Sequence, residues 1–259
     1  MTSNIKTKKI TNAITSIIID DQKTYNSLSF KNLIDLLKVL KKLDADNKVK
    51  VIIIEGAGKG FSAGHNLKEV RGLKKRDKYL KLFNLCSKVM LQIVEGRKPV
   101  IAKVHGAAFA AGCQLVASCD LAIASEESKF ATPGVNLGLF CSTPMVALTR
   151  NVNKKNAMEM LLTGDFIDAK KAKEIGLINN FVSKNELTSE VNKLAEKISS
   201  KSSLTVSIGK RAFYKQYEMS LSEAYRYTSQ TMTDNLLKHD AKEGIKAFMD
   251  KRSPEWRDE

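Results

Sequence analysis

Two short stretches of the chain combine small residues with a nearby polar side chain, a pattern typical of ligand sites close to the main chain. FSAGHNLKE (61–69) follows the apolar run VIIIEG, and HGAAFAAGC (105–113) follows PVIAKV. The N–H groups at the start of a helix lack helical partners, and Ala or Gly leaves them uncovered. Two such starts on successive strand–helix turns can direct two N–H groups at one carbonyl oxygen, which stabilises negative charge there. Small residues can equally serve close helix packing, and the spacing alone does not separate these readings.

Strand and helix patterns alternate through the first part of the chain. Apolar, β-branched runs at 14–19, 51–56, 99–106 and 121–125 predict buried strands. Helical periodicity follows a Ser27 or Ser29 cap, with an expected apolar face of Phe30, Leu33, Ile34, Leu37 and Leu40, and returns at 76–95 and 110–118. This alternation predicts an α/β fold with parallel crossovers. From about residue 140 the patterns are mostly helical, apart from a short strand at 177–183, and 187–252 resembles an assembly element.

Composition narrows the class of protein. The 259 residues are 43% hydrophobic, which is enough for a sizeable core, and no apolar run is long enough to span a membrane. The basic N-terminus carries no secretion signal, so a cytoplasmic location and no membrane partner are predicted. The net charge is +15, but the lysines are spread along the chain without interleaved aromatics, so no nucleic-acid partner is predicted. The cysteines form no CxxC pair and are expected to be buried thiols, with no metal site; they are Cys86, Cys113, Cys119 and Cys141.

Five segments in order resemble the crotonase superfamily, also called the enoyl-CoA hydratase/isomerase superfamily. They are FSAGHNLKE, VHGAAFAAGCQLVASCDLAIAS, FATPGVNLG, LLTGDFIDAKKAKEIGLIN and EGIKAFMDKR. The resemblance covers residues 14–252, and GVNLGLFCSTP and SLTVSIGKRAFYKQ are most similar to one group within the superfamily. It implies a spiral of ββα units over residues 1–195 and a C-terminal helical trimerisation region over 196–259. It also implies a homotrimer or a hexamer of two trimers.

The resemblance further implies an acyl-CoA or enoyl-CoA thioester as ligand, with coenzyme A present only as part of that substrate and no separate cofactor. By motif position, the main-chain N–H groups of His65 and Ala111 form the oxyanion hole. Phe248 and Lys251 lie on the last helix, which in many members approaches the ligand from a neighbouring subunit. The positions implied to bind the CoA thioester are Lys23, Thr24, His65, Asn66, Leu67, Lys68, Phe248 and Lys251.

Two positions depart from the hydratase pattern. Gln114 and Gly134 stand where hydratases of this superfamily carry glutamates. Hydration needs a base for the water and an acid for the α-carbon, and neither an amide nor a glycine transfers protons in this way. The sequence therefore predicts a poor hydratase. Isomerisation, decarboxylation, thioester hydrolysis and non-catalytic binding of a CoA thioester stay open.

Four other polar residues near these motifs are candidates for a catalytic or a structural role. The His65 imidazole titrates near neutrality and can substitute for a missing acid, or it can point away so that only its N–H is used. Asp120 and His105 are expected to be structural, the first as a cap or a helix-packing acid. Glu69 is expected to pair with a lysine.

Overall fold

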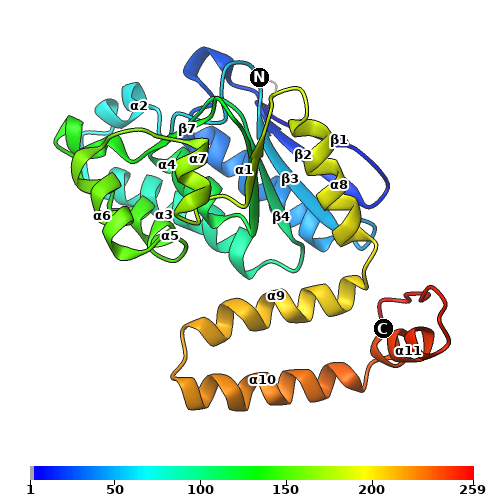
Figure 1. Cartoon of the computed structure of the whole chain (residues 1–259). Coiled ribbons are helices and arrows are strands. Elements are labelled where there is room, and N and C mark those ends of the chain that lie inside the picture. The colour runs from blue at the N-terminus through cyan, green and yellow to red at the C-terminus, as the bar shows by residue number, and fades with distance from the viewer. Residues whose placement is uncertain (1–2) are drawn as a thin grey trace.

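The structure, a computed structural model, describes residues 3–259 as an α/β body followed by a helical arm (Figure 1). The body contains two sheets. The large one has, in spatial order, β1 (Ile5–Lys9), β2 (Ile14–Ile19), β3 (Val51–Gly56), β4 (Val100–Val104), β6 (Leu121–Ser125) and β9 (Asn180–Val182). The small one has β5 (Ala107–Phe109), β7 (Lys129–Ala131) and β8 (Ile167–Asp168).

The helices cover both faces of the large sheet and extend beyond it. The helices of the body are α1 (Phe30–Ala45), α2 (Leu67–Gly72), α3 (Arg76–Glu95), α4 (Ala111–Ser118), α5 (Ser142–Leu148), α6 (Lys154–Thr163), α7 (Ala169–Glu174) and α8 (Leu187–Ser199). The arm has α9 (Ser203–Tyr217), α10 (Leu221–Leu236) and α11 (His239–Met249). Short 3-10 turns, η1 (Gln22–Thr24) and η2 (Pro133–Leu137), precede α1 and α5.

The β-branched runs form strands with both faces buried, because helices pack on each side of the sheet. Within the large sheet, β2, β3, β4, β6 and β9 are parallel, and β1 runs antiparallel beside β2. Along β3, Ile52 and Ile54 belong to the core under α1, α3 and α4. Val51 and Ile53 face the opposite side and pack with α8. The predicted α/β fold is confirmed.

A change of sheet between consecutive strands produces the spiral. After β4 the chain turns at Gly106, whose φ is +57°, and enters β5 of the small sheet. A Cβ atom at Gly106 would stand 2.3 Å from the carbonyl oxygen of Lys59, so only glycine fits this turn. One unit earlier, Ser62 makes an isolated parallel bridge to Ala108 in β5. The loop after β3 and the loop after β4 therefore lie side by side.

Most of the predicted elements are confirmed, but one helical face was assigned incorrectly. β2, β3, β6 and α3 have the predicted bounds, and Ser29 caps α1 through its side chain. Ile34 was expected on the buried face of α1, yet it is 49% exposed. The buried leucines are instead Leu33, Leu36, Leu40 and Leu43. They follow helical spacing, whereas Ile34 projects to one side of that stripe. The N-terminal strand β1 was not predicted.

The arm leaves the body after α8 and folds back as an antiparallel pair, with α9 nearer the body and α10 outside (Figure 1). The predicted boundary at 195/196 falls inside α8, which packs on the large sheet through Leu187, Val191 and Ala195. Large exposed apolar side chains are frequent on the arm: Phe213, Tyr217, Leu221, Tyr225, Met232, Leu237, Ile245, Phe248 and Met249. Within residues 3–259, no helix is both long and apolar enough to cross a bilayer.

Candidate active site

The two small-residue turns identified in the sequence meet at one place. Gly64 adopts a φ of +86°, and a Cβ atom added there would stand 3.1 Å from the main-chain nitrogen of Ala111. The same atom would stand 2.9 Å from the carbonyl oxygen of Phe109. The turn before His65 and the first residue of α4 therefore approach each other closely enough to leave no space for a side chain, and glycine is required at 64.

Both candidate amides lack an intramolecular partner. Within residues 3–259, no hydrogen bond runs from the N–H of His65 or of Ala111 to a protein acceptor. Ala110, which precedes α4, has φ 48° and ψ −116°, a conformation that alanine rarely adopts and that costs about 1–3 kcal/mol. This strained residue connects the end of β5 to the start of α4. The local backbone thus resembles the strained turns that occur at functional sites.

The His65 turn is fastened to the loop that precedes α1. Leu28 N–H donates to the Gly64 carbonyl at 2.8 Å, and the Leu28 carbonyl accepts from His65 Nδ1 at 3.1 Å. This bond places the proton on Nδ1 of the neutral ring. The other nitrogen, Nε2, is buried without a hydrogen-bond partner, and the ring meets Phe83 edge-on at 5.5 Å between centroids. The His65 side chain therefore faces the protein interior beside α3.

Burial makes His65 harder to protonate in the folded protein. Loss of hydration lowers the pKa of His65 from its ordinary value of 6.5, and the Leu28 hydrogen bond and the Glu69 charge oppose this only partly. The unfolded chain then binds more protons below about pH 6.5, so stability present above that pH is lost as the pH falls. When the pH is lowered from about 7.5 to about 5.5, we expect the free energy of unfolding to fall more in the wild type than in His65→Gln. The extra fall is about 1.4 kcal/mol for each unit by which the pKa of His65 differs between the folded and unfolded chain.

Chemical denaturation of both proteins at the two pH values measures this difference. His105→Gln controls for removal of an imidazole elsewhere, since the His105 ring also meets a main-chain carbonyl, that of Gly58, at 2.9 Å. An equal pH dependence in the wild type and His65→Gln contradicts the prediction.

Gln114 lies on α4, one turn after Ala111, and is only 4% exposed. Its Oε1 accepts a weak hydrogen bond from the Cys86 thiol of α3 at 3.9 Å. Cys86 is three residues after Phe83, so the side chains of Gln114 and His65 approach neighbouring positions on the same helix. The two polar side chains adjacent to the candidate amides are thus gathered in one region.

Gly134, in η2, has no room for a side chain. A Cβ atom there would stand 2.2 Å from the Leu139 carbonyl oxygen and 2.8 Å from Cys141 Sγ. The Gly134 carbonyl accepts from Leu139 N–H at 3.0 Å. The volume beside position 134 is therefore filled by main chain and a thiol.

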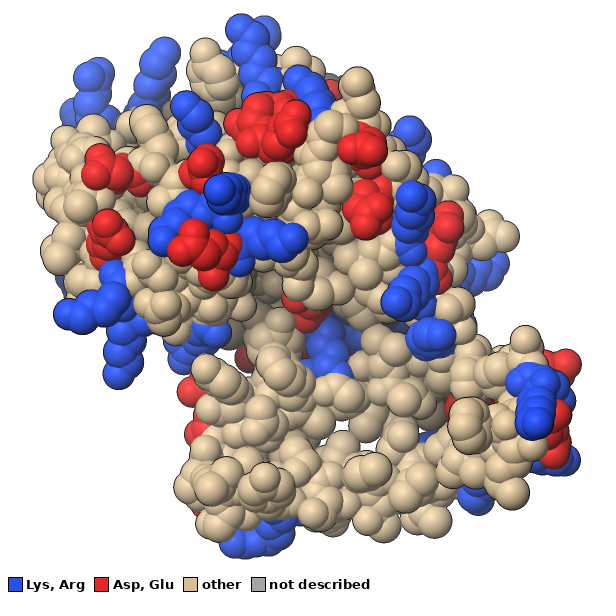
Figure 2. Space-filling view, in the orientation of Figure 1, with Lys and Arg blue, Asp and Glu red and all other residues tan. Residues whose placement is uncertain are grey.

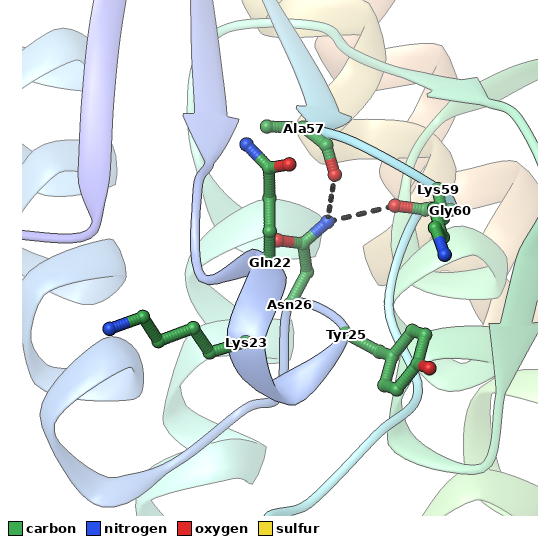
Figure 3. A pocket seen from close by; sticks show the side chains of 7 residues that line it. All are labelled: Gln22, Lys23, Tyr25, Asn26, Ala57, Lys59 and Gly60. Atoms are coloured by element: carbon green, nitrogen blue, oxygen red, sulfur yellow. Dashed lines mark hydrogen bonds between the residues drawn. The ribbon is translucent and has the colours of Figure 1, made fainter.

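A small cavity of about 150 Å³ lies beside η1 (Figure 3). Its lining residues are Gln22, Lys23, Tyr25, Asn26, Ala57, Lys59 and Gly60. Two of them are lysines, and Figure 3 shows the Lys23 side chain extending away from the Asn26 amide. The Asn26 amide donates hydrogen bonds to the carbonyls of Ala57 and Gly60. Thr24, predicted together with Lys23 to bind CoA, is not among the lining residues. Its hydroxyl forms a hydrogen bond with the Ser27 hydroxyl at 2.8 Å between the oxygens. Lys59 was not predicted.

The segment after His65 begins α2. The Asn66 side chain caps this helix by accepting from the N–H groups of Lys68 and Glu69, at 3.1 and 3.2 Å. Leu67 is 58% exposed and Lys68 is also exposed. Glu69, expected to pair with a lysine, accepts from Phe30 N–H at 3.0 Å at the start of α1.

The two predicted residues of the last helix lie elsewhere in the protomer. Phe248, on α11, is 86% exposed, and Lys251 follows α11 with φ 54°. In Figure 1, α11 is at the far end of the arm, well separated from α2 and α4. The single chain therefore does not bring Phe248 and Lys251 to the His65 turn.

Asp120 is structural, as predicted. Its carboxylate accepts from Val100 N–H, from Lys210 Nζ and from the Tyr214 hydroxyl at 2.7, 2.7 and 2.9 Å. Lys210 Nζ also donates to the carbonyls of Ile93 and Lys98, so all three of its protons are used. Lys210 and Tyr214 belong to α9, so this cluster attaches the arm to the body. Sequence reasoning missed both residues because their partners are distant in the chain.

The cysteines are buried and unpaired, and burial raises the pKa of the Cys86 and Cys113 thiols to about 12. Within residues 3–259, no three His, Cys, Asp or Glu side chains form a group suited to a metal ion. On the face seen in Figure 2, lysines and arginines are scattered over the body among acidic residues, while much of the arm carries neither charge.

The family model described as enoyl-CoA hydratase/isomerase matches residues 9–259. The chain belongs to the enoyl-CoA hydratase/isomerase family. It is 50% identical to human enoyl-CoA hydratase domain-containing protein 3, mitochondrial, over 94% of this chain and 80% of that protein. The crystal structure of the human protein superposes with a TM-score of 0.95, at 48% identity over 98% of this chain and all of that chain.

A bacterial member of the enoyl-CoA hydratase/isomerase family is equally similar in structure. The Mycobacterium smegmatis enoyl-CoA hydratase superposes with a TM-score of 0.96, at 42% identity over 98% of this chain and 99% of the other. The crotonase fold is therefore confirmed. The vertebrate relatives are named as mitochondrial proteins, which gives no support to the predicted cytoplasmic location.

Proposed function

We propose that this protein binds an acyl-CoA or enoyl-CoA thioester and polarises its carbonyl between the N–H groups of His65 and Ala111. The observation that carries the proposal is the close approach of the Gly64 turn to the Ala111 nitrogen, together with the lack of an intramolecular acceptor for either amide within the described residues. Preorganised N–H donors stabilise an enolate or a tetrahedral oxyanion without reorganisation during the reaction.

Binding of the coenzyme A phosphates would explain part of the protein's net positive charge. Lys23 and Lys59 line the cavity beside η1, and Lys68 is exposed at the start of α2. Ammonium groups form charge-assisted hydrogen bonds with phosphate oxygens. Asn66 acts at this site through its helix cap, which fixes the direction of α2 after His65.

We further propose that hydration is slow. Gln114 can hold a water molecule or a substrate group by hydrogen bonding, but its amide does not accept the proton of an attacking water. Gly134 offers no side chain, and the surrounding atoms leave no space for one. The two acid–base groups act as a unit, so their losses do not multiply, and hydration should be about 10²–10⁴-fold slower than with two glutamates.

The remaining reaction classes are those that use the same enolate or oxyanion with other proton donors: isomerisation, decarboxylation and thioester hydrolysis. A non-catalytic CoA-thioester binding protein is the second candidate, and the filled space beside Gly134 favours it. Turnover of a panel of enoyl-, malonyl- and saturated acyl-CoAs separates the two. Tight binding without product from any of them supports the binding protein, and hydratase-like turnover of crotonyl-CoA contradicts slow hydration.

Restoring the two glutamates is expected not to restore hydration. In Gln114→Glu the second acid is still missing, and in Gln114→Glu/Gly134→Glu the new side chain collides with Leu139 O and Cys141 Sγ. We expect both variants to stay within about 10-fold of the wild type in crotonyl-CoA hydration. We also expect the double variant to be less stable by about 1–3 kcal/mol because of overpacking.

Crotonyl-CoA absorbance and thermal unfolding test these two expectations, and Gln114→Glu alone is the matched control for the change at 134. A large gain in hydration by the double variant would show that the loop 139–141 moves to accept the glutamate.

Assembly through the arm is part of the proposal. The exposed apolar side chains of α9, α10 and α11 are of the kind that a homotrimer, or a hexamer of two trimers, covers. Such an assembly is the means by which Phe248 and Lys251 of one protomer can approach the thioester site of another. Light scattering of the purified protein gives the subunit number.

A further inference from the structure

Ser62 is hydrogen-bonded to both of the turns that carry the candidate amides. Its side chain is buried, with 1% of the residue exposed. Its N–H donates to the Ala107 carbonyl at 3.0 Å, and its carbonyl accepts from Phe109 N–H at 2.9 Å. These two bonds fix Ser62 to β5, the strand that leads through Ala110 into Ala111.

The hydroxyl of Ser62 makes the second connection. Ser62 Oγ accepts from Gly64 N–H at 3.3 Å and donates to the Asn26 carbonyl at 2.8 Å. Gly64 directly precedes His65, whose N–H is the first candidate donor. Asn26 is itself immobilised, since it is 1% exposed and its Nδ2 donates to the carbonyls of Ala57 and Gly60 at 2.7 and 2.8 Å.

We propose that Ser62 is a positioning residue that sets the separation between the N–H groups of His65 and Ala111. This inference rests on the proposed function. The main chain of Ser62 is fixed to the Ala111 side of the site, and its hydroxyl is fixed to the His65 side. Ser62 therefore links the two donors directly, whereas the Leu28 bonds hold the His65 turn to the loop before α1.

Close packing around Ser62 prevents other groups from taking over this task. A Cβ atom at Gly112 would stand 2.2 Å from Ser62 O and 3.0 Å from Ser62 Cβ, so α4 begins directly against this residue. Removal of the hydroxyl leaves the main-chain bonds to β5 in place. It takes a partner from Gly64 N–H and from Asn26 O, so the His65 turn is then held by its bonds to Leu28 and Tyr25 and no longer by the hydroxyl that ties it to the Ala111 side.

The experiment uses the full-length protein and hexanoyl-CoA labelled with ¹³C at the thioester carbonyl, which has no double bond to hydrate. Infrared spectroscopy measures the carbonyl frequency of the bound thioester, and calorimetry measures the affinities of hexanoyl-CoA and of free CoA. The carbonyl frequency reports how strongly the two N–H groups polarise the thioester. The affinity of free CoA, which has no thioester carbonyl, reports only the contacts made by the rest of the site.

In Ser62→Ala we expect the carbonyl frequency to return toward its value in water. We expect the preference for hexanoyl-CoA over CoA to fall about 10-fold, because a displaced oxyanion donor loses much of its effect. Free CoA should bind with its affinity changed by no more than about 2-fold. Ser62→Cys retains a weaker donor and acceptor, so its frequency should lie between those of the wild type and Ser62→Ala.

Ser128→Ala is the matched control. Ser128 is fully buried and its hydroxyl bonds Val104 O and Ser125, away from both turns, so this variant should keep the wild-type frequency. If wild-type protein binds hexanoyl-CoA without a frequency shift, the proposed function and this inference both fail. If the wild type shows the shift and Ser62→Ala shows the same shift, only the role of Ser62 is overturned. If Ser62→Ala does not fold, Ser62→Cys decides, and a wild-type frequency in that variant overturns the inference.

Discussion

Replacing Lys210 with methionine is expected to lower the free energy of unfolding by about 3–5 kcal/mol, because it leaves the Asp120 carboxylate buried beside an apolar group. The Lys210 and Asp120 side chains are only 6% and 15% exposed and lie 2.7 Å apart. The loss also leaves the carbonyls of Ile93 and Lys98 without this donor. Urea denaturation of the full chain measures the change.

Lys215→Met is the matched control, on the same helix. Lys215 is exposed and lies over the Tyr227 ring at 4.7 Å, an interaction worth about 0.5–1 kcal/mol. The double variant Lys210→Met/Asp120→Leu removes the uncompensated charge and should recover part of the loss. A loss below about 1 kcal/mol in Lys210→Met would mean that this cluster does not hold the arm to the body.

If the two amides act as proposed, Gly112→Ala is expected to weaken hexanoyl-CoA binding by about 10²-fold, because a displacement of about 1 Å between the two donors removes most of their effect. The new Cβ would stand 2.2 Å from Ser62 O, a main-chain atom that cannot rotate away. The start of α4 and the Ser62 segment must therefore separate. Binding of hexanoyl-CoA and of free CoA is measured by calorimetry, and only the first should change strongly.

Gly209→Ala gives the matched glycine-to-alanine control inside a helix. Nothing lies within 4 Å of a Cβ atom built at Gly209, in the middle of α9. Alanine there should stabilise the protein by about 0.5–1 kcal/mol through helix propensity and leave binding unchanged. If Gly112→Ala binds hexanoyl-CoA as the wild type does, the amides do not depend on the contact between Ser62 and Gly112.

Several parts of this fold follow from sequence patterns because local forces fix them. The β-branched runs form strands buried on both sides, and α3 keeps the bounds that its periodicity predicts, 76–95. Gly64 has a positive φ, a conformation that glycine adopts without steric cost. Ile34 was wrongly predicted to be on the buried face of α1. Helical periodicity gives the width of an apolar stripe but not which part of that stripe the other elements cover.

The sequence alone also led to the chemical hypothesis: two helix starts with small residues and, by resemblance, Gln114 and Gly134 where hydratases carry glutamates. Only the tertiary structure decided that Gly64 lies close to the Ala111 nitrogen, that Leu139 and Cys141 occupy the space at Gly134, and that Ser62 bonds both turns. Each of these facts is a contact between segments that are adjacent only because the spiral places successive loops side by side. Local composition does not encode a distance between such segments, since that distance is set by the packing of the whole body.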